Sequence, residues 1–299
     1  MKIIFILTFL VCFSGISYSA DFYSHWGDGR AEISSYNIDM RRYNQMRNGN
    51  SVLIFVTEDI NKETFIKVES PVPKDDRMYV MKLNQIIRFN TGIYDYSVMS
   101  SIFSEVDGGN WPFSLRKVTN SIQDWCGHIF DEVMVGSNYV EGRINSYFER
   151  DGVSFYTVPV SSNFVSGDGL LIRMRELNGE WLKPGQQIAI SFFPSLWGIQ
   201  LRSLERKISD AILTKTIGKD LEISSQIVPV YEWQLDFENN WEKYWIEQEY
   251  PHRILAWEFS DGGRGRLIET LRLSYWELNN NEHIEYRKFL DLNSRKSVD

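Results

Sequence analysis

The sequence predicts a mainly β protein, built on a large curved antiparallel sheet or an open β-barrel with one to three short helices. Two observations carry this prediction. More than ten short runs rich in β-branched and aromatic residues recur along the chain, separated at fairly even spacing by Gly, Asn and Asp. Segments with helical periodicity are scarce.

The N-terminal segment has the order of charged, apolar and small residues that is typical of a secretory signal peptide. Lys2 precedes an apolar run, and small and polar residues follow through Ala20. We expect residues 1–20 to be a signal peptide that is cleaved after Ser19 or Ala20. The run is shorter than the roughly 20 residues that cross a bilayer. A lipoprotein anchored through Cys12 and an uncleaved anchor remain alternatives.

We expect residues 21–299 to form a single mainly β domain, since the sequence contains neither a long repeat nor a low-complexity linker. The whole chain has a net charge of −8, and losing Lys2 with the signal peptide makes it more negative. Nucleic-acid binding rests on basic side chains that displace counterions, so we expect no nucleic-acid partner. Hydrophobic residues make up 43% of the chain, which is enough to bury a sizeable core. No later segment is apolar for long enough to span a membrane.

The first predicted strands form a hairpin. Its first arm covers residues 32–47, its turn is Asn48–Asn50, and its second arm is the β-branched run Ser51–Asp59. The stretch "SDGGRGR", residues 260–266, predicts a later hairpin turn rather than an anion-binding loop. Further strand-like runs cover residues 64–70, 77–84, 114–122, 125–135, 143–150, 153–160, 186–194, 225–237, 253–260 and 267–278.

Three segments are predicted as helices. They are Ile93–Val106, Leu170–Leu177 and Phe237–Tyr250. The stretch Glu205–Ser224 is either a strand-loop-strand excursion or a lever between two halves. One domain with few helices follows from this pattern.

The common catalytic and metal-binding motifs are absent from the sequence. It has no nucleophile elbow, no P-loop and no His-Glu-x-x-His motif. "GDGRAE", residues 27–32, lacks the third glycine of a dinucleotide-binding loop and predicts a turn. The four histidines have spacings that match no set of metal ligands. We therefore expect no cofactor and no metal.

"SIQDWCGHIF", residues 121–130, contains the weak candidates for a catalytic site, Asp124, Cys126 and His128. On a strand these three side chains share one face, but neighbours on that face lie roughly 6.5 to 7 Å apart, beyond the hydrogen-bond reach of about 3 Å. A direct pair of Cys126 and His128 needs a bulge, which Gly127 permits. After cleavage Cys126 is the only cysteine, so no intramolecular disulfide forms. We expect its thiol to be buried.

Ten tryptophans invite a hypothesis of ligand stacking, because aromatic faces bind sugars and other ligands. Core packing is the simpler interpretation, since aromatic side chains also fill the interior of a wide sheet. A curved sheet of many strands leaves room for an apolar ligand inside. Five tryptophans are crowded into the last third of the chain: Trp233, Trp241, Trp245, Trp257 and Trp276.

Several segments together resemble a family of uncharacterised exported bacterial proteins, found largely in Bacteroidetes. The resemblance rests on residues 29–60, 89–103, 121–128 and 144–149, with the words VTED, NTGIY and WCGH. Members are sometimes labelled septum formation inhibitor Maf, although true Maf proteins are cytoplasmic nucleotide pyrophosphatases. The resemblance implies an envelope protein and supplies no catalytic residue.

This sequence departs from the family pattern at two positions. Asn44 stands where a glycine often follows Arg-Tyr, and Asp124 stands where glutamate often precedes the tryptophan. The second change keeps a carboxylate at that position.

Two main hypotheses of function follow, both for a protein exported to the periplasm or cell envelope. The first is a non-catalytic binding or carrier module for a lipid or other apolar small molecule. The second is a thiol-dependent enzyme that uses Cys126 and His128, with Asp124 as the third group. A third reading is a structural assembly factor with an envelope protein as its partner.

Overall fold

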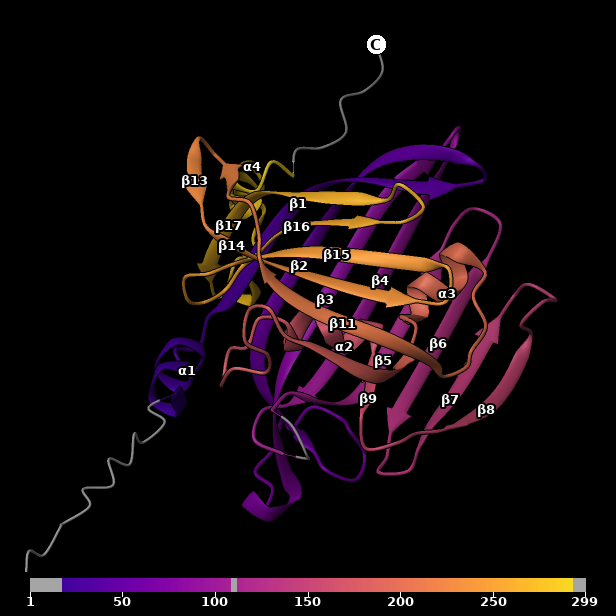
Figure 1. Cartoon of the computed structure of the whole chain (residues 1–299), viewed down its shortest axis with the longest axis horizontal. Helices are drawn as coiled ribbons and strands as arrows, with labels where there is room; N and C mark the ends of the chain where they lie inside the picture. The colour runs from indigo at the N-terminus through magenta and orange to yellow at the C-terminus, as the bar shows by residue number, and fades with distance from the viewer. Residues whose placement is uncertain (1–17, 109–111, 293–299) are drawn as a thin grey trace, which may run out of the picture.

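The computed structural model describes residues 18–108 and 112–292 (Figure 1). Residues 1–17 of the predicted signal peptide lie outside this range, and the described chain opens with helix α1 (Tyr18–Trp26). Within the described residues, fifteen strands form one continuous sheet, in the order β8-β7-β6-β5-β4-β3-β2-β1-β17-β16-β15-β14-β11-β10-β9. All neighbouring strands run antiparallel except β9 and β10. The predicted mainly β class with a large curved sheet is confirmed, and the sheet does not close into a barrel.

The first half of the sheet is a meander in which each strand pairs with the next one along the chain. Two-residue turns connect β1 to β2 and β3 to β4. Its strands are β1 (Ala31–Arg42), β2 (Gln45–Asn61), β3 (Arg77–Thr91), β4 (Tyr94–Glu105), β5 (Ser114–Gln123), β6 (His128–Val135), β7 (Tyr139–Ser146) and β8 (Val153–Pro159).

The second half of the sheet returns across the first and joins it where β17 pairs with β1. Its strands are β9 (Phe164–Ser166), β10 (Gln187–Phe193), β11 (Ser209–Ile217), β14 (Val230–Phe237), β15 (Asn240–Glu247), β16 (Ile254–Phe259) and β17 (Arg264–Leu273). The short strands β12 (Leu221–Ile223) and β13 (Gln226–Val228) form a separate hairpin.

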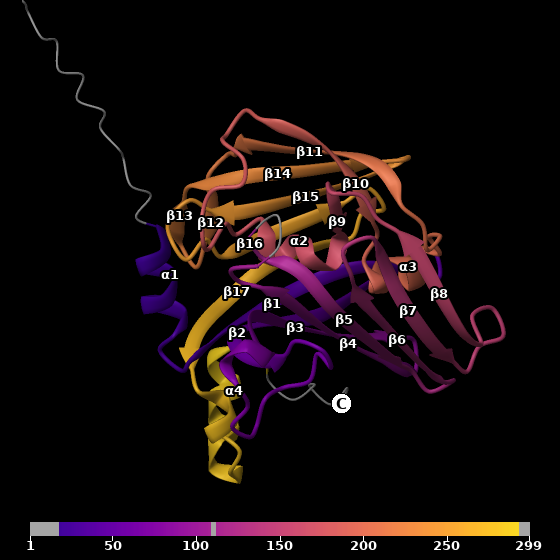
Figure 2. The ribbon, with the colours of Figure 1, turned by 90° about the horizontal axis from the view of Figure 1, so that it is seen from below.

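Two short helices lie between the two halves of the curved sheet (Figure 2). Helix α2 (Gly167–Arg173) contacts β4 and β5, and α3 (Leu196–Arg202) follows β10. The C-terminal segment lies against the outer face of β1, β2 and β17, where Leu290 packs beside Ile33. This segment contains the one-turn helix α4 (Tyr286–Phe289) and the 3-10 turns at Tyr275–Glu277 and Asn281–Glu285; another 3-10 turn is Lys74–Asp76.

The main hydrophobic core fills the space between the two halves and draws on both of them. Leu53 and Leu83 from the first half and Trp233 and Leu235 from the second are fully buried. Burial of this apolar surface contributes about 25 cal/mol for each Å² removed from water, so the core holds the sheet in its folded-over shape.

A buried ion pair also joins the two halves. Arg175, which follows α2, is completely buried, and its Nη1 lies 2.8 Å from Glu32 Oε1 on β1. Arg175 also donates hydrogen bonds to the carbonyl oxygens of Pro251 and His252. These acceptors offset the free-energy cost of removing the charged guanidinium from water.

The first hairpin is confirmed, but its turn was predicted in the wrong place. The chain reverses at Tyr43 and Asn44, which both have positive φ, as a two-residue hairpin turn requires. Gly49 lies inside β2 instead. A Cβ atom there would come 2.4 Å from the carbonyl oxygen of Arg88, so the glycine serves the close approach of β3. The later hairpin is confirmed: Phe259 and Gly263 close it, and Gly262 has a φ of 88°.

Two of the three predicted helices are wrong. Ile93–Val106 contains strand β4, whose side chains alternate between buried and partly exposed, as the two faces of a strand do. Phe237–Tyr250 spans the turn between β14 and β15, and Glu238 in that turn has a positive φ. The third prediction, Leu170–Leu177, is confirmed in part by α2.

Most of the remaining strand predictions coincide with strands, but 143–150 runs past the end of β7 at Ser146 and 267–278 runs past the end of β17 at Leu273. Two others differ more. Residues 64–70 contribute only an isolated bridge between Ile60 and Lys67. The run 125–135 begins as a turn, and its strand β6 starts at His128. Glu205–Ser224 is a strand-loop-strand excursion from β11 to β12. Because β11 pairs on both sides, with β10 and β14, this stretch is part of the sheet rather than a lever.

Candidate functional site

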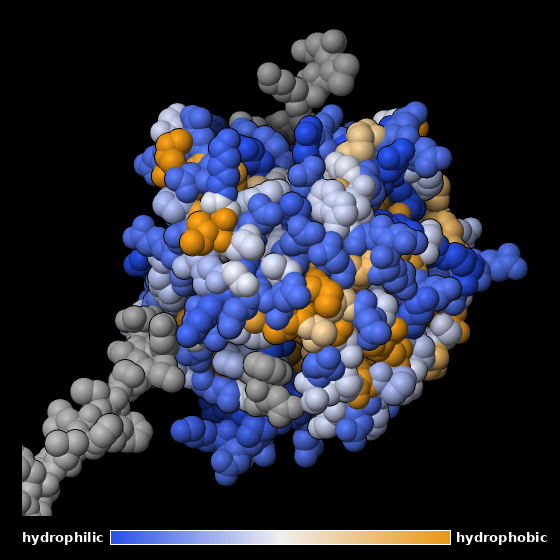
Figure 3. All heavy atoms as spheres, viewed as in Figure 1, coloured by the Kyte–Doolittle hydropathy of each residue, from blue (hydrophilic) through white to orange (hydrophobic). Residues whose placement is uncertain are grey.

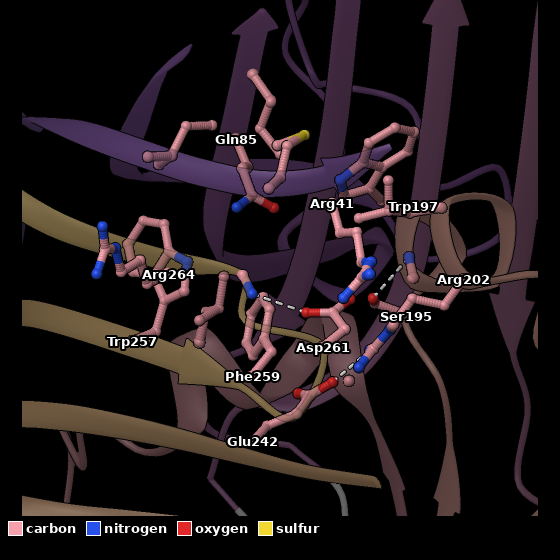
Figure 4. A pocket seen from close by; sticks show the side chains of 18 of the residues that line it. Arg41, Gln85, Ser195, Trp197, Arg202, Glu242, Trp257, Phe259, Asp261 and Arg264 are labelled. Atoms are coloured by element: carbon pink, nitrogen blue, oxygen red, sulfur yellow. Dashed lines mark hydrogen bonds and ion pairs between the residues drawn. The ribbon is translucent and has the colours of Figure 1, made fainter. Parts of the chain in front are cut away.

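A first cavity lies between the two halves of the sheet, at the ends of α2 and α3 (Figure 4). Its cavity volume is about 80 Å³. Its apolar walls come from β1, β3, the two helices and the β16–β17 hairpin: Ile38, Met40, Ile87, Leu171, Trp197, Leu201, Trp257 and Phe259.

One of the polar features of this cavity wall is an ion pair. Arg202 Nη2 on α3 donates to Glu242 Oε1 on β15, and both side chains are largely buried. The hydroxyl of Tyr244 donates to Glu242 Oε2 at 2.6 Å. Burial, and then the neighbouring carboxylate, raise the pKa of Tyr244. The wall therefore keeps Tyr244 neutral and fixes the position of Arg202.

Asp168 is a buried acid at the start of α2, and it also lines the first cavity. Its Oδ2 accepts a hydrogen bond of 2.9 Å from the backbone N–H of Leu196. Burial raises the pKa of Asp168 to about 7, because the hydrogen bond from Leu196 only partly offsets the loss of hydration. The negative charges of Asp131 and Glu242 add to this rise. Asp168 therefore gains or loses its proton near neutral pH.

A second cavity of about 300 Å³ lies beside the first. Trp197 borders both cavities. The second cavity is more polar, and the ends of β1 and β4, the β5–β6 turn and α3 contribute its walls: Arg42, Tyr43, Tyr96, Ile122, Asp124, Cys126, Gly127, Ile129, Phe148, Arg150, Asp151, Trp197 and Gln200.

Hydrogen bonds link the aromatic and cationic side chains of this second cavity. The hydroxyl oxygens of Tyr43 and Tyr96 are 2.8 Å apart, and Arg42 Nη2 donates to the Tyr96 oxygen at 3.2 Å. Burial acts to raise the pKa of Tyr43. Hydrogen bonds from Tyr96 and Tyr94 and the positive charge of Arg42 have the larger, opposite effect, so the pKa of Tyr43 is lowered. Burial, followed by the hydrogen bond to Tyr43, raises the pKa of Tyr96.

The structure places the three predicted catalytic residues on a turn rather than on one strand. Asp124 Oδ1 accepts the backbone N–H groups of Cys126 at 2.7 Å and Gly127 at 2.9 Å. His128 opens β6, and its Nε2 lies 3.1 Å from Ser121 Oγ. Because the turn breaks the alternation of a strand, the predicted shared face does not exist.

The expectation that the thiol of Cys126 is buried is wrong. Cys126 is exposed, because it lies at the tip of the β5–β6 turn. Asp124 and Cys126 both line the second cavity, whereas His128 does not. In the described part of the chain, no hydrogen bond joins the thiol to His128. The three residues are neighbours without the contacts of a catalytic triad.

The tryptophans divide between core and cavity. Trp233 is fully buried and stacks on Trp181, with 5.7 Å between the ring centroids, so it belongs to the core. Trp257 lines the first cavity. Trp276 is 46% exposed, near the C-terminus.

Sequence reasoning missed Arg42, Trp197, Arg202 and Glu242. These residues come from strands and a helix that are distant in sequence, so no motif marks them. Over residues 18–108 and 112–292, no group of three or more His, Cys, Asp or Glu side chains could hold a metal ion. No helix in the same part of the chain is long and apolar enough to cross a membrane.

Hydrophilic residues predominate on the face seen in Figure 1, and apolar residues gather near its centre (Figure 3). No known family model, curated protein or solved structure matches this chain. The geometry of the two cavities is therefore the basis for a function.

Proposed function

We propose that this protein is an exported, non-catalytic carrier or binding module for a lipid or other apolar small molecule, and that the first cavity holds the apolar part of the ligand. The observation that carries the proposal is the cavity itself. Apolar atoms supply the larger share of its exposed lining, and seven charged side chains also border it: Asp39, Arg41, Asp168, Arg202, Glu242, Asp261 and Arg264. An apolar lining can bury the apolar part of a ligand, and polar groups beside it can orient that ligand.

Two of the candidate catalytic groups lack the arrangement that catalysis needs. Glu242 is already held by Arg202 and Tyr244, so it is not placed as a free base. The exposed thiol of Cys126 lacks a hydrogen bond to a base in the described structure, which weighs against the thiol-dependent enzyme.

The proposed location rests on the sequence. The order of residues at the N-terminus and the resemblance to exported bacterial proteins support export to the periplasm or envelope.

Titration with the neutral fluorescent probe N-phenylnaphthylamine tests the proposal. We expect saturable binding by the wild-type protein. Leu201→Trp adds an indole to the cavity wall, so we expect at least about tenfold weaker binding through lost volume. Ile217→Trp is the matched control, because Ile217 is 71% exposed on β11. Equal binding by both variants, or no binding by the wild type, would contradict the proposal.

A further inference from the structure

The second cavity contains two opposite charges that the protein does not pair with each other. Of the four charged side chains that line it, Arg150 and Asp151 are in ion pairs. Asp151 pairs with Arg150 at 3.1 Å and with Arg206 at 3.0 Å. Arg42 and Asp124 are different: neither forms an ion pair within the described residues.

Arg42 interacts only with neutral groups. Its Nη2 donates to the Tyr96 oxygen at 3.2 Å, and its Nη1 reaches the carbonyl oxygen of Gln200 at 3.4 Å. The guanidinium carbon lies 4.6 Å from the centroid of the Tyr43 ring. Its Nε is shielded from solvent and has no hydrogen-bond partner in the described structure. Its charge therefore remains available to an anionic group of a ligand.

Asp124 is held in place by the backbone. Its Oδ1 accepts two N–H groups, from Cys126 and Gly127, which fix the carboxylate at the cavity wall. No lysine, arginine or histidine neutralises it among the described residues. The side chain of Tyr96 also hydrogen-bonds to this carboxylate. A cationic group of a ligand would therefore find a fixed carboxylate without a counter-charge there.

Together, Arg42 and Asp124 form a dipolar site. A purely anionic head group would be attracted by Arg42 and repelled by Asp124, and a purely cationic one would meet the reverse. A head group that carries both charges, separated by a short linker, satisfies both residues. Trp197 borders both cavities, so the head group in the second cavity and the part of the acyl chain assigned to the first would lie on either side of this side chain.

The aromatic rings discriminate between two kinds of ammonium group. A quaternary ammonium is usually bound over free aromatic faces. Here Tyr96 stacks on Phe89 at 4.7 Å between centroids, and Arg42 lies near the rings of Tyr43 and Tyr96. Asp124 instead offers a carboxylate, which accepts hydrogen bonds from a primary ammonium.

We propose that the second cavity binds the zwitterionic head group of a phosphoethanolamine lipid, with its phosphate at Arg42 and its primary ammonium at Asp124. This inference rests on the proposed function, because the first cavity is assigned to the acyl chain of the same molecule.

Displacement of N-phenylnaphthylamine by three single-chain lysolipids tests the inference. The lysolipids share one acyl chain and carry phosphoethanolamine, phosphocholine or phosphoglycerol, and each is used below its micelle concentration. For the wild-type protein we expect the phosphoethanolamine lipid to bind about tenfold more tightly than the other two. The phosphoglycerol head group has no cation for Asp124, and the quaternary ammonium of phosphocholine has no N–H to donate to it. Equal affinities for the three lysolipids, or tightest binding of the phosphoglycerol or phosphocholine lipid, would overturn the inference.

Two variants test the roles of Arg42 and Asp124 one at a time. Arg42→Ala should weaken all three lysolipids by about tenfold, because all of them carry the phosphate. Asp124→Asn should reduce the preference for phosphoethanolamine over phosphoglycerol to within about twofold. Its amide oxygen can still accept the N–H groups of Cys126 and Gly127, so this variant should fold and stays informative even if Arg42→Ala does not. An unchanged preference in Asp124→Asn would overturn the inference.

A matched control and the probe distinguish a failure of this inference from a failure of the proposed function. Arg88→Ala removes the same charge from an exposed position on β3 and should leave all affinities unchanged. If the probe itself does not bind, the proposed function fails. If the probe binds but the head group has no effect, only the inference about the second cavity fails.

Discussion

Arg202 and Glu242 form an ion pair on the wall of the first cavity, although they lie 40 residues apart in the sequence. Their side chains are 11% and 6% exposed, so the pair joins α3 to β15 largely out of water. Removing one partner of such a pair leaves the other charge buried and uncompensated, which costs more than the pair itself contributes.

Glu242→Gln should therefore destabilise the protein by about 3 kcal/mol. The amide cannot neutralise Arg202, although it can still accept a hydrogen bond. Chemical denaturation measures the change. Glu258→Gln is the control, because Glu258 is exposed on the adjacent strand β16 and its change should cost less than about 0.5 kcal/mol. Equal stabilities of the two variants would mean that the pair does not support the cavity wall.

Asp168 should make the stability of the protein depend on pH. Burial raises its pKa in the folded state to about 7, against an ordinary value of 3.8. Below pH 4 both the folded and the unfolded chain hold the proton. Between about pH 4 and pH 7 the unfolded chain has released its proton while the folded chain still holds it, so the folded state loses stability as the pH rises, and above about pH 7 the loss stays constant. The difference corresponds to roughly 4 kcal/mol.

Asp168→Asn removes this titration and keeps an oxygen that can accept the N–H of Leu196. Relative to the wild type, the variant should gain stability between pH 4 and pH 8. Urea denaturation of both proteins at several pH values measures this gain. A difference that stays constant over that range would show that Asp168 does not titrate as the burial indicates.

Cys126 should react with a thiol reagent while the protein is folded, because its side chain is exposed at the β5–β6 turn. We expect its rate with Ellman's reagent to be within about tenfold of the rate in the unfolded chain. Cys126→Ala should retain binding of N-phenylnaphthylamine, as a non-catalytic carrier requires. A folded thiol that reacts far more slowly, or loss of binding in the variant, would contradict this interpretation.

The exported protein should begin immediately after Ser19 or Ala20. Cleavage there leaves Phe22 and Trp26, which are 0% and 1% exposed, in the mature chain. Phe22 packs against Phe113, with 5.7 Å between the ring centroids, so its loss would open the core. N-terminal sequencing of the protein from the envelope fraction locates the cleavage. Processing at Cys12, or a mature end beyond Phe22, would contradict the expectation.

The sheet was predictable from the sequence because its strands repeat a local pattern. β4 shows how the prediction can still fail. The apolar residues of its sequence, "YDYSVMSSIFSE", fit the spacing of a helix as well as that of a strand, and its pairing with β3 and β5 makes it a strand. The turn at Tyr43 and Asn44 was missed because a stronger turn signal, "NGN", lies four residues further on. Gly49 in that stretch instead allows β3 to pack closely against β2.

The cavities were not predictable, because their residues meet only when the sheet folds over. Arg42 ends β1, Asp124 begins the β5–β6 turn, and Trp197 lies on α3. No spacing in the sequence relates these three residues. The stretch 121–130 was singled out for catalysis by Asp124, Cys126 and His128, not for a cavity. In the structure Asp124, Cys126 and Gly127 line the second cavity.

Native mass spectrometry of the protein purified from the envelope of a producing bacterium tests the central claim most directly. The wild-type protein should carry an additional mass that extracts into organic solvent, and Leu201→Trp, prepared in the same way, should lack most of it. The control Ile217→Trp should match the wild type. A wild-type protein that shows only the mass of its own chain would contradict the account.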